Sequence, residues 1–253
     1  MQTTPYLLAI DSGNTAIKWG LHNGLRWIAN DVALQVEREI WQQKLAALPP
    51  CTGVIVSNVA GKTADDNLKA LLNQSQACQH WWIVAQANQC GVRNGYVSPE
   101  QLGCDRWAAL IAAWHYLRRG CLVINVGTAM TIDVLSDAGE FRGGAILPGP
   151  ELMQQALADR ANGIKMTNTG KFQMLPDNTE DSVFSGMIHA VTGAIERMYT
   201  LNFPNPDNPL PRILVSGGNA AVIREHLHLP HKVMDNLVME GLVVIAREEF
   251  DPT

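Results

Sequence analysis

The stretch that decides the fold is Leu7-Leu8-Ala9-Ile10-Asp11-Ser12-Gly13-Asn14-Thr15-Ala16-Ile17-Lys18-Trp19. Its four leading apolar residues predict a buried strand that ends on the carboxylate of Asp11. Gly13 and Asn14 tolerate positive φ and therefore predict a turn. Residues 16–21 then predict a second strand, so the stretch is a strand–turn–strand unit with one acidic group at the turn.

This turn suits a metal-bound polyphosphate. Backbone N–H groups and the Thr15 hydroxyl can donate to phosphate oxygens, and Lys18 can neutralise charge. For a single turn taken alone, an ordinary hairpin remains the alternative, with Asp11 and Asn14 satisfying their own backbone.

The same pattern returns later in the chain. It reads Leu122-Val123-Ile124-Asn125-Val126-Gly127-Thr128-Ala129 and leads into a predicted strand over residues 131–135, a turn over 137–139 and a third strand. A further glycine turn, Ser216-Gly217-Gly218, follows the apolar run 213–215. Two similar units and a later Gly-Gly turn predict a duplicated α/β fold with a nucleotide cleft between its halves.

This layout resembles the acetate kinase, sugar kinase, Hsp70 and actin superfamily. The resemblance implies two ribonuclease H-like (actin-like ATPase) domains, which we place at residues 1–118 and 119–253. Fold alone does not give function.

Composition narrows the class of protein. The chain has 253 residues, 47% of them hydrophobic, and a net charge of -5, so it can bury a substantial core and shows no nucleic-acid footprint. Its five cysteines form no C-x-x-C pair and leave one over, which favours reduced thiols over a disulfide or zinc framework. There is no signal peptide and no apolar run of membrane-spanning length. We expect a soluble, cytoplasmic protein.

Periodicity predicts the remaining elements. The expected helices cover residues 34–48, 63–72, a stretch from Pro99 onward, 151–160, 179–199 and 237–250, and the expected further strands cover 53–57 and 81–84. Thr179-Glu180-Asp181-Ser182 is typical of a helix N-terminus.

Asp105 and Arg106 stand out within the helical stretch that follows Pro99. Adjacent opposite charges usually form a solvated pair on a helix face. Here the neighbours are apolar, namely Leu102, Trp107, Ala108, Leu110, Ile111 and Ala112. A charged pair in such surroundings is a candidate site.

At this point the chain resembles a specific family, the type III pantothenate kinases, also called the Bvg accessory factor family. The resemblance runs along essentially the whole sequence. It is carried by Asp11-Ser12-Gly13-Asn14-Thr15, Tyr96, Gly103-Cys104-Asp105-Arg106-Trp107, Gly127-Thr128-Ala129, Thr131-Ile132-Asp133, Gly143-Gly144, Pro148-Gly149, Asn178-Thr179 and Ser216-Gly217-Gly218.

The resemblance implies transfer of the ATP γ-phosphoryl group to the primary hydroxyl of pantothenate, the first step towards coenzyme A. Asp105 would be the general base, and Asp11 would place Mg²⁺, through water. The remaining assignments are phosphate contacts from Ser12, Gly13, Asn14, Thr15, Lys18 and Thr128, and a pantothenate pocket from Tyr96, Gly103, Cys104, Asp105, Arg106 and Thr179.

One residue departs from the family pattern. The family usually carries Asp at the position of Asn125, where the carboxylate is associated with a monovalent cation, K⁺ or NH₄⁺. An asparagine keeps a carbonyl ligand and loses the charge, which puts that cation site in doubt.

The resemblance also implies a homodimer. The acidic charge balance and the lack of a long apolar run predict no nucleic acid and no membrane among the partners. Two alternatives stay open from the sequence. One is a regulatory protein of the Bvg accessory factor kind with weak or no kinase activity, and the other is a different sugar or acid kinase of the superfamily.

Overall fold

The computed structural model describes residues 6–161, 164, 170–203 and 212–250. The chain forms two compact units. The first comprises the described parts of Met1–Arg118, Gly139–Phe141 and Asn236–Thr253, and the second those of Arg119–Ala138 and Arg142–Asp235. Helix α7 therefore groups with the first unit, whereas the domain boundary predicted from the sequence would place it with residues 119–253.

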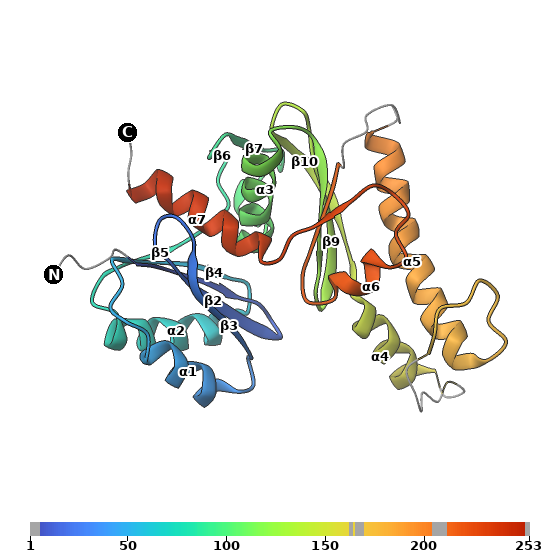
Figure 1. Ribbon diagram of the computed structural model, residues 1–253, viewed down its shortest axis with the longest axis horizontal. Coiled ribbons are helices and arrows are strands. Elements are labelled where there is room, and N and C mark those ends of the chain that lie inside the picture. Colours follow the sequence, from blue (N-terminus) through green and yellow to red (C-terminus); the bar gives the residue numbers. More distant parts are fainter. Residues whose placement is uncertain (1–5, 162–163, 165–169, 204–211, 251–253) are drawn as a thin grey trace. The chain divides into compact units, whose positions relative to one another are not determined.

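The first unit is built on a five-stranded sheet with the order β3-β2-β1-β4-β5 (Figure 1). Strand β1 is antiparallel to β2 and parallel to β4, which places it at the centre. The strands are β1 (Leu7–Ser12), β2 (Ala16–His22), β3 (Trp27–Leu34), β4 (Gly53–Asn58) and β5 (Gln79–Trp82).

Helices cover both faces of this sheet. Helices α1 (Arg38–Ala46) and α2 (Lys62–Ser75) bury Trp41, Leu45, Leu68 and Leu72 in a core with Leu8 and other strand residues. Helices α3 (Cys104–Leu117) and α7 (Leu237–Phe250) pack together and contact β4. The short strands β6 (Asn88–Gln89) and β7 (Val92–Asn94) form a hairpin, and β7 pairs in parallel with the first two residues of β10.

The α3–α7 contact explains the grouping of α7. Every residue from Arg106 to Ala113 is buried, so α3 needs apolar cover on all sides. Helix α7 provides this cover, and its Gly241 lets the two helices approach closely. A Cβ at this position would overlap the backbone carbonyl of Ala108.

The second unit is built on five strands of the seven-stranded sheet, in the order β12-β11-β8-β9-β10. Its strands are β8 (Cys121–Val126), β9 (Ala129–Leu135), β10 (Glu140–Pro148), β11 (Ile213–Ser216) and β12 (Lys232–Val233). Helices α5 (Thr179–Asn202) and α6 (Ala220–Arg224) bury apolar side chains in a core with these strands. Helix α4 (Pro150–Arg160) contacts α5.

The two sheets repeat one topology. The central strands β1 and β8 each pair antiparallel with the next strand of the chain and parallel with a later one, β4 or β11. The duplicated α/β fold predicted from the two strand–turn–strand stretches is confirmed.

Several local predictions were wrong. Strand β3, for which no bounds were predicted, extends through Leu34, so the first helix begins at Arg38 instead of Leu34. Strand β5 covers Gln79–Trp82 rather than residues 81–84. Helix α5 is capped by Asn178, whose side chain accepts from the Asp181 backbone N–H, rather than by Thr179.

Candidate active site

Asp11 is the penultimate residue of β1, the central strand of the first unit. In the sheet register its direct partners are Lys18 on β2 and Ser57 on β4. Side chains of directly paired residues lie on the same face of a sheet. The carboxylate is therefore flanked by an ammonium group on one side and by a fully buried hydroxyl on the other.

The turn after β1 differs in one respect from the prediction. Neither Gly13 nor Asn14 has positive φ. The turn is closed instead by a hydrogen bond from the Gly13 backbone N–H to the Ala16 carbonyl (3.0 Å). A Cβ on Gly13 would lie 3.3 Å from that same carbonyl oxygen, so a close approach, not a left-handed backbone, favours glycine here.

The Asp11 carboxylate is suited to bind a cation. Its Oδ1 atom is buried and has no hydrogen-bond partner among the described residues. Burial raises the pKa of Asp11 to about 7, and the Asp105 carboxylate adds to the rise while Lys18 and Ser57 oppose it. A buried carboxylate oxygen without a donor is an unfavourable arrangement unless a ligand satisfies it. Mg²⁺ prefers carboxylate oxygen and often uses only one or two carboxylates, so the residues present fit the metal.

Asp105 and its neighbours form the start of α3. Gly103 is the N-cap position, and Cys104 is the first helical residue. Asp105 Oδ1 accepts from the Arg106 backbone N–H (2.8 Å), as acidic groups in a first helical turn often do. Desolvation nevertheless raises the pKa of Asp105 above its ordinary value. The opening of the helix therefore holds a carboxylate that is more basic than a solvated one.

Cys104 links this helix start to the central sheet. Its Sγ lies 3.4 Å from Ser57 Oγ and 3.5 Å from the Asn58 carbonyl oxygen. Ser57 in turn interacts with the Asp11 side chain. The chain of contacts from Asp11 through Ser57 to Cys104 brings the two predicted segments together within the first unit.

Arg106 and Tyr96 are also brought together. Arg106 is only 7% exposed, and its Nη1 donates to the Tyr96 hydroxyl at 3.4 Å. The guanidinium group lies 5.8 Å from the centroid of the Phe141 ring, and the Tyr96 ring lies 5.1 Å from that ring. Phe141 was not predicted, and no motif marks it, because it comes from a distant part of the chain.

The second unit repeats the turn with different side chains. Asn125 is paired with Thr131 on β9 and with Ser216 on β11. The Gly127 backbone N–H donates to the Ala129 carbonyl (3.0 Å), and Thr128 is exposed. Gly217 has φ +104°, and a Cβ there would lie 2.7 Å from Asn125 Oδ1.

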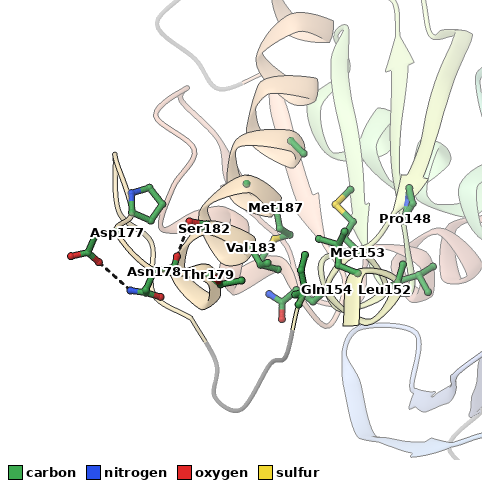
Figure 2. A pocket seen from close by; sticks show the side chains of 16 residues that line it. Pro148, Leu152, Met153, Gln154, Asp177, Asn178, Thr179, Ser182, Val183 and Met187 are labelled. Carbon is green, nitrogen blue, oxygen red and sulfur yellow. Dashed lines mark hydrogen bonds between the residues drawn. The ribbon is translucent and has the colours of Figure 1, made fainter. Parts of the chain in front are cut away.

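Thr179 lines a separate cavity of about 1090 Å³ within the second unit (Figure 2). Its walls come mainly from α4 and α5, and Leu152, Met153, Val183 and Met187 make them largely apolar. Figure 2 shows Asn178 beside Thr179, hydrogen-bonded to Asp177 and Ser182. Thr128, Asn125 and Thr179 thus belong to the second unit, and the other predicted site residues belong to the first.

Two further observations limit the kinds of site. Within the described residues no group of three or more His, Cys, Asp or Glu side chains is placed to hold a metal ion. The same part of the chain contains no helix with the length and hydropathy required to span a bilayer.

Sequence comparison identifies the family. A family model described as type III pantothenate kinase matches residues 7–201. The chain belongs to the type III pantothenate kinase family. A type III pantothenate kinase from Nitrosomonas eutropha is 52% identical over 99% of this chain and 98% of its own. One from Nitrosospira multiformis is 48% identical over 96% and 92%. Membership in a type III pantothenate kinase family confirms the enzyme interpretation over the regulatory alternative.

Structural comparison supports the fold of these kinases. A conserved Baf family protein from Campylobacter jejuni matches with a TM-score of 0.65 and 18% identity, over 96% of this chain and 99% of its own. The activator of the 2-hydroxyisocaproyl-CoA dehydratase from Clostridium difficile, solved with bound ADPNP, matches with a TM-score of 0.56 and 13% identity over 98% and 95%. At these identities the likeness shows the shared fold alone.

Proposed function

We propose that this chain transfers the γ-phosphoryl group of ATP to the primary hydroxyl of pantothenate, with Asp105 as the general base. One observation carries the proposal beyond family membership. Two desolvated carboxylates, Asp11 and Asp105, lie close enough for the charge of Asp105 to raise the pKa of Asp11. Phosphoryl transfer between a metal-bound donor and a hydroxyl acceptor uses one group for the metal and another for the proton.

The donor side is assigned to the turn after β1. We assign the ATP phosphates to donors from Ser12, Gly13, Asn14 and Thr15, with Lys18 neutralising charge. Asp11 would hold Mg²⁺, directly or through water, and the metal when bound supplies neutralisation of the phosphate charge. From the second unit, Thr128 is assigned to the same phosphates.

The acceptor side is assigned to the start of α3. The raised pKa of Asp105 makes its carboxylate a better proton acceptor near neutral pH than a solvated aspartate. It accepts the hydroxyl proton while the acceptor oxygen attacks the γ-phosphorus and the bond to the leaving phosphate oxygen breaks.

The pantothenate carboxylate is assigned to Arg106, whose fork-shaped guanidinium is held by Tyr96 and Phe141. The Tyr96 hydroxyl, the backbone at Gly103 and Cys104, and Thr179 from the second unit are assigned to the hydroxyl and amide groups of the same substrate.

The side chain of Asn125 fits a monovalent cation poorly. It offers one neutral carbonyl oxygen and no negative charge, so we propose weak dependence on K⁺ or NH₄⁺. The homodimer remains a prediction of the family resemblance, and the cytoplasmic location remains a prediction of the composition.

The test is a kinetic comparison of three variants. Asp105→Asn is nearly isosteric but cannot take the proton, so kcat should fall about 10²–10⁴-fold while ATP still binds. Arg106→Lys keeps the charge but loses the fork, so KM for pantothenate should rise with KM for ATP unchanged. Asp66→Asn, which removes an exposed carboxylate paired with Lys62, is the matched control and should leave both constants unchanged.

Activity of Asp105→Asn within a few-fold of wild type would assign Asp105 a capping role at α3 and contradict the base assignment. A panel of other hydroxy acids and sugars, run with wild type, tests the acceptor itself. Turnover of another acceptor in preference to pantothenate would contradict the proposed substrate.

A further inference from the structure

Asn94 starts the loop that carries Tyr96, and nothing in the sequence singled it out. It is the last residue of β7, and its backbone N–H donates to the Ala87 carbonyl oxygen (2.9 Å). Asn94 is only 8% exposed, which is unusual for an asparagine. A buried amide is costly unless its donors and its acceptor find partners. The partners of this amide therefore indicate what Asn94 holds in place.

The amide group of Asn94 closes the loop over residues 95–98. Its Oδ1 accepts from the Tyr96 backbone N–H (3.0 Å), and its Nδ2 donates to the Pro99 carbonyl oxygen (3.2 Å). The Pro99 carbonyl oxygen also accepts from the Leu102 backbone N–H (3.1 Å), in the 3₁₀ turn that leads to α3. A backbone N–H can only donate and a carbonyl oxygen can only accept, so this position requires a side chain with both functions. One amide thus connects the Tyr96 backbone to the turn before α3.

Tyr96 reaches the start of α3 from this loop. Its ring centroid lies 5.1 Å from that of Phe141, and its hydroxyl accepts from Arg106 Nη1 (3.4 Å). Phe141 and Arg106 are buried, whereas Tyr96 is half-buried and keeps accessible surface of its own. Asp105 lies at the same end of the helix, because a Cβ on Gly103 would lie 2.6 Å from Asp105 Oδ1 and 3.9 Å from Arg106 Cδ. Tyr96 thus contacts the helical turn that holds the proposed base and remains accessible to a ligand.

The pairing of β7 with β10 supports the same arrangement. Asn94 is the direct partner of Phe141 in the parallel register, and Arg93 is the partner of Glu140. Arg93 Nη2 and Glu140 Oε1 form an ion pair at 3.0 Å. The residue that closes the loop is therefore fixed to the strand that carries the ring packed against Tyr96.

We propose that Asn94 is a positioning residue for the acceptor substrate, which acts by holding the loop over residues 95–98, and with it Tyr96, beside Arg106. This inference rests on the proposed function, because that assigns pantothenate to this cluster. A Tyr96 that is held in place before binding loses little conformational freedom when the substrate arrives, whereas a mobile loop must be ordered at that moment. Without the Asn94 amide, this ordering opposes pantothenate binding and leaves ATP binding unaffected.

The experiment measures the Kd for pantothenate by calorimetry, with Mg²⁺ and a non-hydrolysable ATP analogue present, alongside steady-state kinetics. Asn94→Leu keeps the branched shape of the side chain and removes its donor and its acceptor. It should raise Kd and KM for pantothenate roughly tenfold and leave KM for ATP within about twofold. Because Asp105 is untouched, kcat should stay within about threefold. Asn73→Leu, the same exchange at an exposed position of α2, is the control and should change none of these constants.

Thermal unfolding identifies a variant that does not fold. In that case Asn94→Asp takes the place of Asn94→Leu, since it keeps the acceptor for the Tyr96 N–H and loses only the donor to the Pro99 carbonyl oxygen. It should raise the Kd for pantothenate about threefold or more, again with KM for ATP unchanged.

A double-mutant cycle with Tyr96→Ala distinguishes positioning of the tyrosine from a general structural role. If Asn94 acts through Tyr96, its substitution should change the Kd for pantothenate less than about twofold in the Tyr96→Ala background. An equal fold-change in both backgrounds would overturn the inference. An unchanged Kd in the single variant, or a parallel rise in KM for ATP, would overturn it as well.

The binding assay also keeps the two proposals apart. Wild type that binds pantothenate without phosphorylating it contradicts the proposed function, while the Kd values still decide the role of Asn94. Wild type that phosphorylates pantothenate while the Asn94 variant binds it normally overturns only the inference about Asn94. Wild type that does not bind pantothenate contradicts both.

Discussion

The two strand–turn–strand units share a backbone and differ in charge. Asp11 in the first corresponds by register to Asn125 in the second. The partners on the next strand are Lys18 and Thr131, and those on the parallel strand are Ser57 and Ser216. The hydroxyl is thus kept in both units, whereas the acid and the base of the first become an amide and a hydroxyl in the second.

This difference indicates how a duplicated fold divides its chemistry. The strand order and the closed turn are common to both units. They position the backbone N–H groups of the turn, and this needs no charged side chain. A charged pair is costly to bury, and Asp11 shows the cost directly in its raised pKa. We infer that the first unit buries charged groups because they are needed to bind the metal, and that the second unit contributes neutral contacts.

The strongest test of the comparison converts the first unit into the second. Asp11→Asn removes the proposed metal contact, which contributes several kcal/mol to stabilising the transition-state charge. We expect kcat/KM for ATP to fall about 10²–10³-fold at fixed Mg²⁺. Steady-state kinetics over a range of Mg²⁺ measures it. An unchanged constant would mean that the two turns are interchangeable for the metal.

A second test concerns glycine, which the turn after β1 and the turn after β11 use differently. Gly217→Ala should destabilise the protein by about 3 kcal/mol or more, because φ is +104° and the new Cβ would lie 2.6 Å from the Val126 backbone nitrogen. Gly13→Ala should cost less than about 1 kcal/mol, since its φ is ordinary and its closest approach is 3.3 Å. Urea unfolding measures both, and equal losses would contradict the structural distinction.

The Asp11→Asn variant should also be more stable than wild type when metal is absent. Burying a carboxylate without a hydrogen-bond partner at Oδ1 is unfavourable, and a neutral amide lowers that cost by about 1–3 kcal/mol. Thermal unfolding in EDTA at pH 8 measures the change. A lower midpoint than wild type would show that the carboxylate is satisfied within the protein and is not held for a cation.

The reverse exchange, Asn125→Asp, should have a smaller effect. A restored carboxylate attracts a monovalent cation by about 1–4 kcal/mol at a few ångströms, between water-like and surface-like dielectrics. We expect K⁺ activation to appear or tighten several-fold. A potassium titration at constant ionic strength, maintained with a bulky cation, measures it. Strong saturable activation of wild type that the exchange leaves unchanged would refute the argument.

The smallest expected effect lies at the other end of the same strands. His22 pairs with Leu7, at the position where the second unit has Leu135 paired with Cys121. Desolvation, and then the charge of Arg247, lowers the pKa of His22 below its usual 6.5. The unfolded chain therefore binds more protons below pH 6.5, and stability falls as pH drops from about 7 through that value.

One such histidine contributes at most about 1.4 kcal/mol per pH unit. His22→Leu copies the second unit and should flatten the slope of unfolding free energy between pH 7 and 5.5. A slope identical to wild type would show that His22 does not contribute to it. Gly24 is the residue to inspect in that variant, because its backbone N–H donates to His22 Nδ1 (3.0 Å).

The sequence was sufficient for elements whose pattern is local. The repeated apolar run that begins at Leu122 lies in β8, the predicted strand at 131–135 lies within β9, and α7 has the predicted bounds, because their apolar runs are continuous or amphipathic. It failed at the end of β3, an edge strand in which only Ala33 is buried and which therefore lacks alternation. Its last apolar residue, Leu34, joined a false helical pattern.

The candidate site residues show the same contrast between local and non-local sequence signals. Asp11, Asp105 and Arg106 were predicted because they interrupt apolar stretches. Gln35, whose side chain contacts the turn after β1, and Phe141 were not, since each reaches the site only through the return of a distant strand. Gln35 follows an edge strand and Phe141 lies near the start of β10, and a single residue at such a position carries no periodic signal of its own.

The grouping of α7 with the first unit has a consequence for synthesis on the ribosome. The chain emerges from its N-terminus, so β1 and α3 are made early, but α3 lacks its apolar partner until residues 237–250 follow. At typical elongation rates that interval is on the order of 10 s. The half of the molecule that is translated first is therefore the last to be completed, and a nascent chain displays the bare α3 surface to chaperones throughout the synthesis of the other half.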